Sequence, residues 1–228
     1  MQGNNNEGET GNNKFYTAKG KYLGTDGKNE GKIFVVYNVK SDLDGTQDVL
    51  FYIDNQDVIS FIKENNGNAN AFSEGCIAYL YSFELPTLEN RIMMIKNVST
   101  DTGKDKDALN PSNNREYGGV IGGDEVYQSE VKSPKDSGEI RITLPGDCDT
   151  YHSHPSGFVY EEFGGNVGGY SKKYYFQQIP SSFDLSHCGN HNCFVIGRGS
   201  GYVYGYNSSG THIKIKTSLF NDPNYFKP

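Results

Sequence analysis

The sequence predicts an α+β fold, an α/β-like sandwich in which helices flank a mixed central β-sheet. Aromatic and β-branched residues gather in short runs separated by Gly, Asn and Asp, as in strands joined by tight turns. The composition, with 28 Gly, 17 Tyr, 13 Phe and no Trp, agrees with many such turns. Between these runs, two segments carry the spacing or the capping residues of helices.

The N-terminal part is expected to be an extension of the main domain. Residues 1–14 consist mostly of Asn, Gly and Glu, which bury too little apolar surface to offset the entropy of ordering, so we expect a flexible tail. A β-hairpin extension is expected over 15–69, because Lys32–Val39 and Val49–Ile53 have the composition of two strands. The main domain is then 70–228, and the chain is long enough for both parts.

The turn between these two expected strands, KSDLDGTQD, places Asp42, Asp44 and Asp48 around Gly45. Carboxylates are ligands that calcium prefers, so a calcium loop is one interpretation. The other is an ordinary hairpin loop with an Asp-Gly turn. The loop lacks the later bidentate glutamate of an EF-hand, which favours the turn.

Two helices and several strands are expected in the main domain. From Asn70 to Phe83 the apolar residues recur at helical spacing, and Pro86 prevents continuation. Pro180 precedes a Ser181 N-cap, and Asp184 follows three residues later as in a capping box. The segment NRIMMIKNVS is expected to be a strand or a helical turn. The remaining runs read as strands, the last three as a meander: EYGGVIGG, EVYQSEV, EIRITL, DTYHSH, CFVIG, GYVYGY and THIKIK.

Charge argues against two classes of partner, and hydropathy argues against a membrane span. The formal net charge is −7, from 21 Lys and Arg against 28 Asp and Glu. This balance disfavours nucleic acid and anionic membranes, because both are bound through phosphates. No apolar run approaches the roughly 18 residues of a membrane helix, so no membrane span is expected.

The stretch YHSHPSG places His152 and His154 two positions apart. Side chains at i and i+2 leave one face of a strand about 6.6 Å apart, so both imidazoles can reach one ion at Zn–N distances of about 2.0 to 2.1 Å. A catalytic zinc needs a third protein ligand, and Asp184 is the candidate. Alternatively, the histidines simply end an ordinary strand, and Asp184 only closes the capping box on Ser181.

The segments HSHP and PSSFD, with REYGGVI ahead of them, resemble the HxHP…SxxD signature and the glutamate-bearing strand of the JAMM (MPN-type) zinc metalloproteases. The resemblance covers roughly Asn70 to Lys216 and is closest to the JAMM-like domains of bacterial polymorphic toxins and related secreted proteins. It implies a cytidine-deaminase-like JAMM core. It also implies a bacterial origin and a secreted or cell-surface location, as part of a longer or processed protein.

Carried over residue by residue, the resemblance implies that His152, His154 and Asp184 bind Zn²⁺. Glu116 would be the general base, and Ser181 would stabilise the oxyanion. The implied activity is hydrolysis of a peptide or isopeptide amide bond in a protein or peptide substrate by a zinc-activated water. Glu116 is preferred among the glutamates because it opens an apolar strand with a Gly pair, where another backbone or a substrate can approach closely. The alternative is a JAMM-like binding or scaffold module that is inactive or autoinhibited.

The spacing between His154 and Ser181 departs from the family pattern, because an insertion of 26 residues, 155–180, separates them. The insertion is aromatic and carries two Gly pairs. Long loops in compact domains are often functional. We therefore expect a lid that grips substrate or a plug that keeps the enzyme inactive, with a decorated surface loop as the alternative.

The sequence HCGNHNC brings His187, Cys188, His191 and Cys193 together. All four side chains are good zinc donors, so a second zinc is one interpretation. Structural zinc usually takes its ligand pairs from two separated places in the chain, whereas this cluster is contiguous. A buried thiol and a Cys188–Cys193 disulfide are the alternatives.

Overall fold

The computed structural model describes residues 11–37, 55–73, 75–103, 111–129, 142–163 and 169–228. In this part of the chain, α-helices accompany three β-sheets, two of them mixed, which confirms the predicted α+β class. None of the described helices is long and apolar enough to span a membrane. The chain forms two compact units, Met1–Thr87 with Pro223–Pro228 and Leu88–Asp222. Residues 70–87 therefore belong to the first unit and not, as the sequence suggested, to the main domain.

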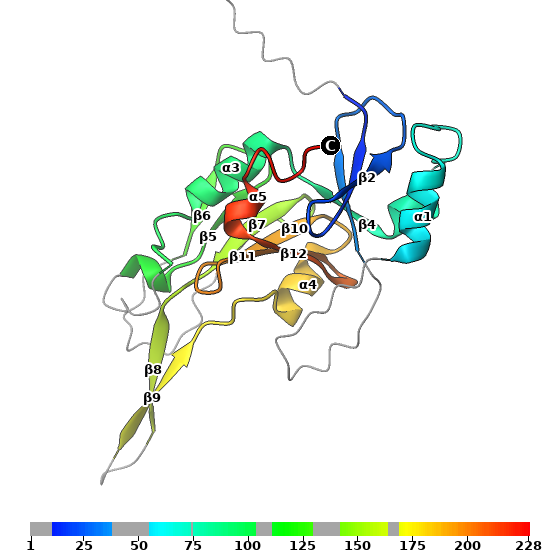
Figure 1. The fold of residues 1–228 in the computed structure, drawn as a ribbon. Helices are drawn as coiled ribbons and strands as arrows, with labels where there is room; N and C mark the ends of the chain where they lie inside the picture. The colour runs from blue at the N-terminus through cyan, green and yellow to red at the C-terminus, as the bar shows by residue number, and fades with distance from the viewer. Residues whose placement is uncertain (1–10, 38–54, 74, 104–110, 130–141, 164–168) are drawn as a thin grey trace, which may run out of the picture. The chain divides into compact units, whose positions relative to one another are not determined.

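A four-stranded mixed sheet forms the first unit (Figure 1). Its elements are β1 (Lys14–Thr17), β2 (Tyr22–Thr25), β3 (Ile33–Val36), α1 (Gln56–Glu64), α2 (Ile77–Leu80) and β4 (Ser82–Leu85). The strand order is β2-β1-β3-β4, and β1 runs parallel to β3 while the other pairs are antiparallel. Helix α1 buries Val58, Ile59 and Ile62 in a core that contains Phe15 and Phe34 of the sheet.

The predicted flexible tail at 1–14 is too long at its C-terminal end. Strand β1 begins at Lys14, and the Asn13 side chain is fully buried. Asn13 donates a hydrogen bond to Asp26 Oδ2 at 2.9 Å and accepts one from the Lys32 backbone N–H at 3.0 Å. These hydrogen bonds to residues distant in the chain hold Asn13 in place, although its polar side chain suggested a flexible tail. Residues 1–10 lie outside the described part of the chain.

The strand predicted at Lys32–Val39 is present as β3. Its expected hairpin partner, Val49–Ile53, and the loop with Asp42, Asp44 and Asp48 lie outside the described residues. The hairpin and the calcium interpretation therefore stay predictions. Within the described residues, β3 pairs with β1 and β4, so it belongs to the four-stranded sheet and not to a hairpin alone.

The helix predicted from Asn70 to Phe83 is wrong over most of its length. Only Ile77–Leu80 is helical, and Phe83 lies in β4 beside β3. Gly75 has a φ of +77°, a left-handed conformation that interrupts a helix. The helical spacing is misleading because Phe72 and Phe83 are buried by tertiary packing from a turn and from a strand.

A six-stranded mixed sheet forms the second unit. Its elements are α3 (Leu88–Asn97), the 3₁₀ turn η1 (Pro111–Asn114), β5 (Tyr117–Val120), β6 (Val126–Gln128), β7 (Thr150–His154), β8 (Phe158–Phe163), β9 (Tyr170–Tyr175), α4 (Ser182–Cys188), β10 (Cys193–Gly197), β11 (Tyr202–Asn207), β12 (Gly210–Lys216) and α5 (Thr217–Phe220). The strand order is β12-β11-β10-β7-β5-β6, and of these pairs β7 and β10 alone are parallel. The predicted terminal meander is confirmed, and NRIMMIKNVS folds mainly as helix α3.

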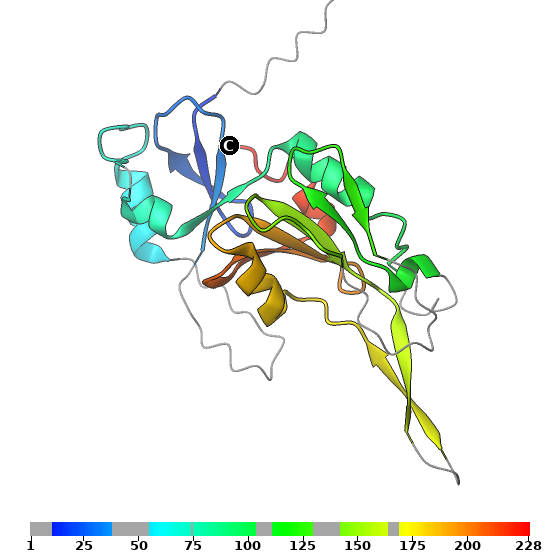
Figure 2. The same ribbon diagram turned by 180° about the vertical axis from the view of Figure 1, so that it is seen from behind.

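Alternating side chains of β7 and β10 show which helix covers which face. Asn97 of α3 donates a hydrogen bond to Tyr151 Oη at 2.7 Å, and Phe194 packs on Phe220 of α5 with ring centroids 5.8 Å apart. His152 follows Tyr151 and therefore points to the opposite face. That face is covered by α4, so helices lie on both sides of the sheet (Figures 1 and 2).

The insertion at 155–180 contains an antiparallel hairpin. Strand β8 pairs with β9, so that Phe158 lies opposite Tyr175 and Phe163 lies opposite Tyr170. The hairpin extends away from the six-stranded sheet in both views (Figures 1 and 2). Whether it acts as a lid, a plug or surface decoration stays a prediction.

Candidate metal centre

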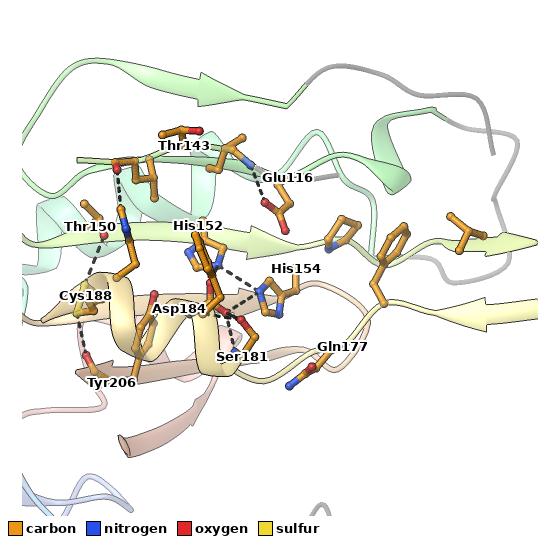
Figure 3. A pocket seen from close by; sticks show the side chains of 18 residues that line it. Glu116, Thr143, Thr150, His152, His154, Gln177, Ser181, Asp184, Cys188 and Tyr206 are labelled. Carbon is orange, nitrogen blue, oxygen red and sulfur yellow. Dashed lines mark hydrogen bonds and ion pairs between the residues drawn. A yellow bond between two sulfur atoms is a disulfide. The ribbon is translucent and has the colours of Figure 1, made fainter. Parts of the chain in front are cut away.

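Strand β7 presents both histidines to the face that α4 covers. His152 lies opposite Gly118 of β5 and Val195 of β10, and His154 lies opposite Gly197. Because residues two apart share a face of a strand, the two imidazoles are neighbours. Their Nε2 atoms lie 3.2 Å apart, and both side chains are buried (Figure 3).

Helix α4 brings Asp184 to this histidine pair. The Ser181 N-cap accepts a hydrogen bond from the Asp184 backbone N–H at 3.2 Å, and Asp184 Oδ2 accepts one from the Ser181 N–H at 2.6 Å. The same carboxylate lies 3.2 Å from His152 Nε2 through Oδ1 and 3.4 Å from His154 Nε2 through Oδ2. Asp184 therefore caps the helix and also faces the histidines, so the two sequence interpretations are compatible.

The spacing of these three side chains fits one metal ion. Their ligand atoms all lie within 4.8 Å of one another. In a tetrahedral site with Zn–N distances of about 2.0 to 2.1 Å, neighbouring ligand atoms are about 3.3 Å apart. The contacts of 3.2, 3.2 and 3.4 Å among His152, His154 and Asp184 match that separation.

The donor set is also suited to zinc. Two imidazoles and one carboxylate give three protein ligands, which is the number that catalytic zinc sites use when they keep one position open. Metal-binding histidines usually donate a hydrogen bond from their second ring nitrogen. His154 Nδ1 is buried, and the described residues supply no hydrogen-bond partner for it. Three side chains that can bind the metal directly are thus present. The second hydrogen bond that would orient the His154 ring is not supplied by the described residues.

The charge state of Asp184 agrees with a ligand role. Burial alone would raise the pKa of its carboxyl group. Hydrogen bonds and charge interactions with His152 and His154 outweigh burial and hold this pKa well below its usual range. The group is therefore ionised at neutral pH, and a carboxylate is the form that binds a metal.

A buried carboxylate that the sequence did not single out holds the turn after His154. Asp101 accepts hydrogen bonds from the Ser156 backbone N–H at 2.7 Å and from the Ser156 hydroxyl at 2.5 Å. The backbone N–H of Arg198 donates to the His154 carbonyl at 3.1 Å, and its side chain donates to the Asp101 carbonyl at 2.5 Å. These bonds fix the backbone on both sides of Pro155. No local sequence signal connects residues this far apart.

Glu116 immediately precedes β5 and faces the same cavity as the histidines. The pairing of Gly118 with His152, extended by two residues, places Glu116 opposite His154 on one face of the sheet. Glu116 Oε2 accepts a hydrogen bond from the Ile142 backbone N–H at 2.9 Å. In Figure 3 the side chain points from the neighbouring strand toward the histidine pair. Glu116 thus lies beside the candidate metal ligands without belonging to the group suited to a metal.

Ser181 lines the cavity and also binds Asp184. Its hydroxyl donates a hydrogen bond to Asp184 Oδ2 at 2.7 Å. Together with the cap, this bond fixes the direction of the carboxylate. The geometry therefore supports a positioning role for Ser181, and the oxyanion role stays a prediction.

A cavity of about 450 Å³ contains the whole predicted site. Its wall includes Glu116, His152, His154, Ser181 and Asp184.

The wall of the cavity also includes Tyr206 of β11, which sequence reasoning missed. Burial raises the pKa of Tyr206, and the nearby carboxylates of Asp184 and Glu116 raise it further, so the hydroxyl stays protonated and can donate a hydrogen bond. Tyr206 pairs with Cys193 of β10, so both side chains point to the same face of the sheet. The alternating tyrosines of GYVYGY, which share one face of the strand, were the signal that the sequence offered.

The cluster at the end of α4 forms a disulfide in the structure. Cys188 is bonded to Cys193. His187 Nε2 lies 2.7 Å from the Leu144 carbonyl oxygen, and His191 Nδ1 lies 3.6 Å from an Asp149 carboxylate oxygen. Within the described residues, the group suited to a metal is that of the first site alone. The structure therefore selects the disulfide over the second zinc and the buried thiol.

Comparison with known proteins identifies no relative of this chain. No protein-family model, no curated protein and no solved structure matches it.

Proposed function

We propose that this protein is a zinc-dependent hydrolase of the JAMM type that cleaves a peptide or isopeptide amide bond. The observation that carries the proposal is the convergence of His152, His154 and Asp184 at 3.2 to 3.4 Å, on the wall of a cavity that also contains Glu116. A cytidine-deaminase-like JAMM core belongs to the same proposal. A mixed sheet with helices on both faces is compatible with that core.

The proposal includes the setting that the sequence resemblance implies: a bacterial protein that is secreted or lies at the cell surface, as part of a longer or processed chain. Disulfides persist mainly in oxidising compartments outside the cytosol. The Cys188–Cys193 disulfide supports such a compartment.

Each residue of the site has a chemical role in the proposed reaction. A zinc ion held by His152, His154 and Asp184 would supply a water with a pKa of about 7 and polarise the scissile carbonyl. Glu116 accepts the proton of the attacking water and returns it to the leaving amine, which needs a carboxylate beside the ion. Ser181 keeps Asp184 oriented, and the proposal also assigns its hydroxyl to stabilising the oxyanion of the tetrahedral state.

Metal content and hydrolysis test the proposal separately. Purified protein is expected to contain about one zinc per chain. His152→Ala and Asp184→Ala should lose the zinc, whereas Glu116→Gln should retain it and lose hydrolysis. A mass-spectrometric search for new peptide termini in host and bacterial lysates, with wild type beside Glu116→Gln, measures hydrolysis. Ser181→Ala should lose about 10²- to 10³-fold in rate, as when one oxyanion donor is removed.

Glu125→Gln is the matched control, because Glu125 is exposed and its carboxylate accepts a hydrogen bond from Tyr127 Oη at 3.0 Å. This variant should cleave like wild type. Full activity of Glu116→Gln would show that the base assignment is wrong. A wild-type protein that binds zinc and cleaves nothing in either lysate would instead favour the inactive binding or scaffold module.

A further inference from the structure

The cavity extends beyond the metal-binding residues, and most of the additional side chains in its wall are apolar. The apolar side chains come from the segment before β7, from β8, from the segment after β9 and from α4. They are those of Ile142, Leu144, Val159, Phe176 and Phe183. Apolar walls with a few convergent polar groups are typical of ligand sites.

The rim of this cavity is held in place. Phe183 is 51% exposed, which is high for a phenylalanine. Its ring stacks on His187 with 5.8 Å between centroids and 7° between planes, and His187 Nε2 lies 2.7 Å from the Leu144 carbonyl oxygen. These contacts connect α4 to the segment before β7. The wall is therefore preformed, which lowers the entropic cost of binding.

The charges of the wall favour an uncharged ligand. Among its described residues there is no lysine or arginine. The carboxylates are engaged, because Asp184 contacts both histidines and Glu116 accepts the hydrogen bond from Ile142. An acidic ligand group would meet two carboxylates without a matching lysine or arginine. A polar group packed against the apolar side chains of the wall would lose its hydration without a partner among them.

We propose that the apolar part of the cavity is a specificity subsite for a bulky apolar side chain, of the size of leucine or phenylalanine, on the substrate residue next to the scissile amide. The inference rests on the proposed function, which brings that amide to the histidines on one wall of the same cavity. The whole cavity, metal-binding residues included, measures about 450 Å³, within the range of about 300 to 1,000 Å³ typical of small-molecule pockets. A glycine would leave most of this space unfilled.

Amino acid hydroxamates test the subsite, because they share one zinc-binding group and differ in the side chain. Titration calorimetry on zinc-loaded protein should give an affinity for leucine hydroxamate at least about tenfold higher than for glycine hydroxamate, since one methylene in an apolar pocket changes discrimination by about 10- to 200-fold. Aspartate hydroxamate should bind no better than the glycine compound. Phe176→Ala should abolish most of the leucine preference. Tyr175→Ala is the matched control, because Tyr175 is adjacent, 58% exposed and outside the cavity wall.

A metal-free experiment separates the subsite from the hydrolase. Saturation-transfer NMR on metal-stripped protein compares N-acetyl-leucinamide with N-acetylglycinamide. Leucine selectivity here in a protein that takes up no zinc would support the subsite and overturn the proposed function. Equal binding of leucine and glycine probes in both experiments would overturn the subsite, even where hydroxamate binding supports the metal centre. An unchanged leucine preference in folded Phe176→Ala would also overturn it, and Val159→Ala replaces that variant if thermal denaturation shows it unfolded.

Discussion

Gly118 lies directly beside His152 on the neighbouring strand, and there is no room for a side chain at this position. A Cβ atom would meet the Tyr151 carbonyl oxygen and would lie 2.5 Å from Ile142 Cδ1 and 3.0 Å from His152 Cβ. The Gly pair after Glu116 predicted a close approach by a backbone or a substrate. In the structure, the backbone of β7 and the Ile142 side chain make that approach. Gly118 thus helps to set the positions of His152, a candidate metal ligand, and of Ile142 in the cavity wall.

Replacing Gly118 by alanine should therefore affect both stability and metal binding. We expect a loss of about 1 to 3 kcal/mol in the free energy of unfolding, as for overpacked cores. Zinc affinity should fall by about 10- to 100-fold, as when the support of a ligand is disturbed. Thermal denaturation and competition with a fluorescent chelator measure the two effects. Gly169→Ala is the control, because its Cβ would only reach the Phe163 carbonyl oxygen at 3.5 Å. Wild-type zinc affinity in Gly118→Ala would contradict the argument.

At the scale of single elements, α4 is a helix of 7 residues that is fixed at both ends. The capping box of Ser181 and Asp184 fixes its start, and the disulfide from Cys188 to Cys193 attaches its end to β10. So short a helix is marginal by itself in water. Its two attachments, rather than its helix propensity, hold Asp184 against the histidines.

Removal of the disulfide should loosen α4. The double variant Cys188→Ala, Cys193→Ala is expected to lose about 2 kcal/mol in the free energy of unfolding, from the closure entropy of a short loop. Its zinc affinity should also fall, because Asp184 is carried by the released helix. Denaturant unfolding and zinc competition measure these effects, with Cys148→Ala as the control, since Cys148 is a free thiol of the same unit. Unchanged zinc affinity in the double variant would mean that the cap alone positions Asp184.

At the scale of the whole molecule, a buried histidine should make stability depend on pH. His212 of β12 is 7% exposed, and burial lowers its pKa from 6.5 to about 4. Between these values the unfolded chain binds a proton that the folded chain lacks. The stability associated with neutral His212 is therefore present above pH 6.5 and is lost as the pH falls toward 4.

The loss should amount to at most about 3 kcal/mol at pH 4 relative to neutral pH. Denaturant unfolding of wild type and His212→Gln at a series of pH values measures it. The variant should show a flatter profile between pH 6.5 and 4, because its side chain does not titrate, while other groups contribute equally to both proteins. Parallel profiles for the two proteins would rule out His212 as the source.

Local sequence patterns correctly predicted those elements that depend on residues close together in the sequence. The cap before α4 and the alternation of the last strands are effects of this kind, and both appear in the structure. The helix expected at Asn70–Phe83 is wrong because its buried residues belong to different elements and only happen to be spaced as in one helix. Asn13 looked like part of a tail because its partners are distant in the chain.

By itself, the sequence determined which side chains were candidates for the site: His152 and His154 through their spacing on a strand, and Asp184 through its place after the N-cap. The tertiary structure alone decided that they meet, that Asp101 supports the turn after them and that Cys188 bonds Cys193 rather than a metal. The physical reason is that the histidines and Asp184, like Asp101 and Ser156, come from segments far apart in the chain. The bond between Cys188 and Cys193, only five residues apart, depends on how the end of α4 meets β10. The existence of these contacts depends on how the sheet and α4 pack, which no local pattern of residues encodes.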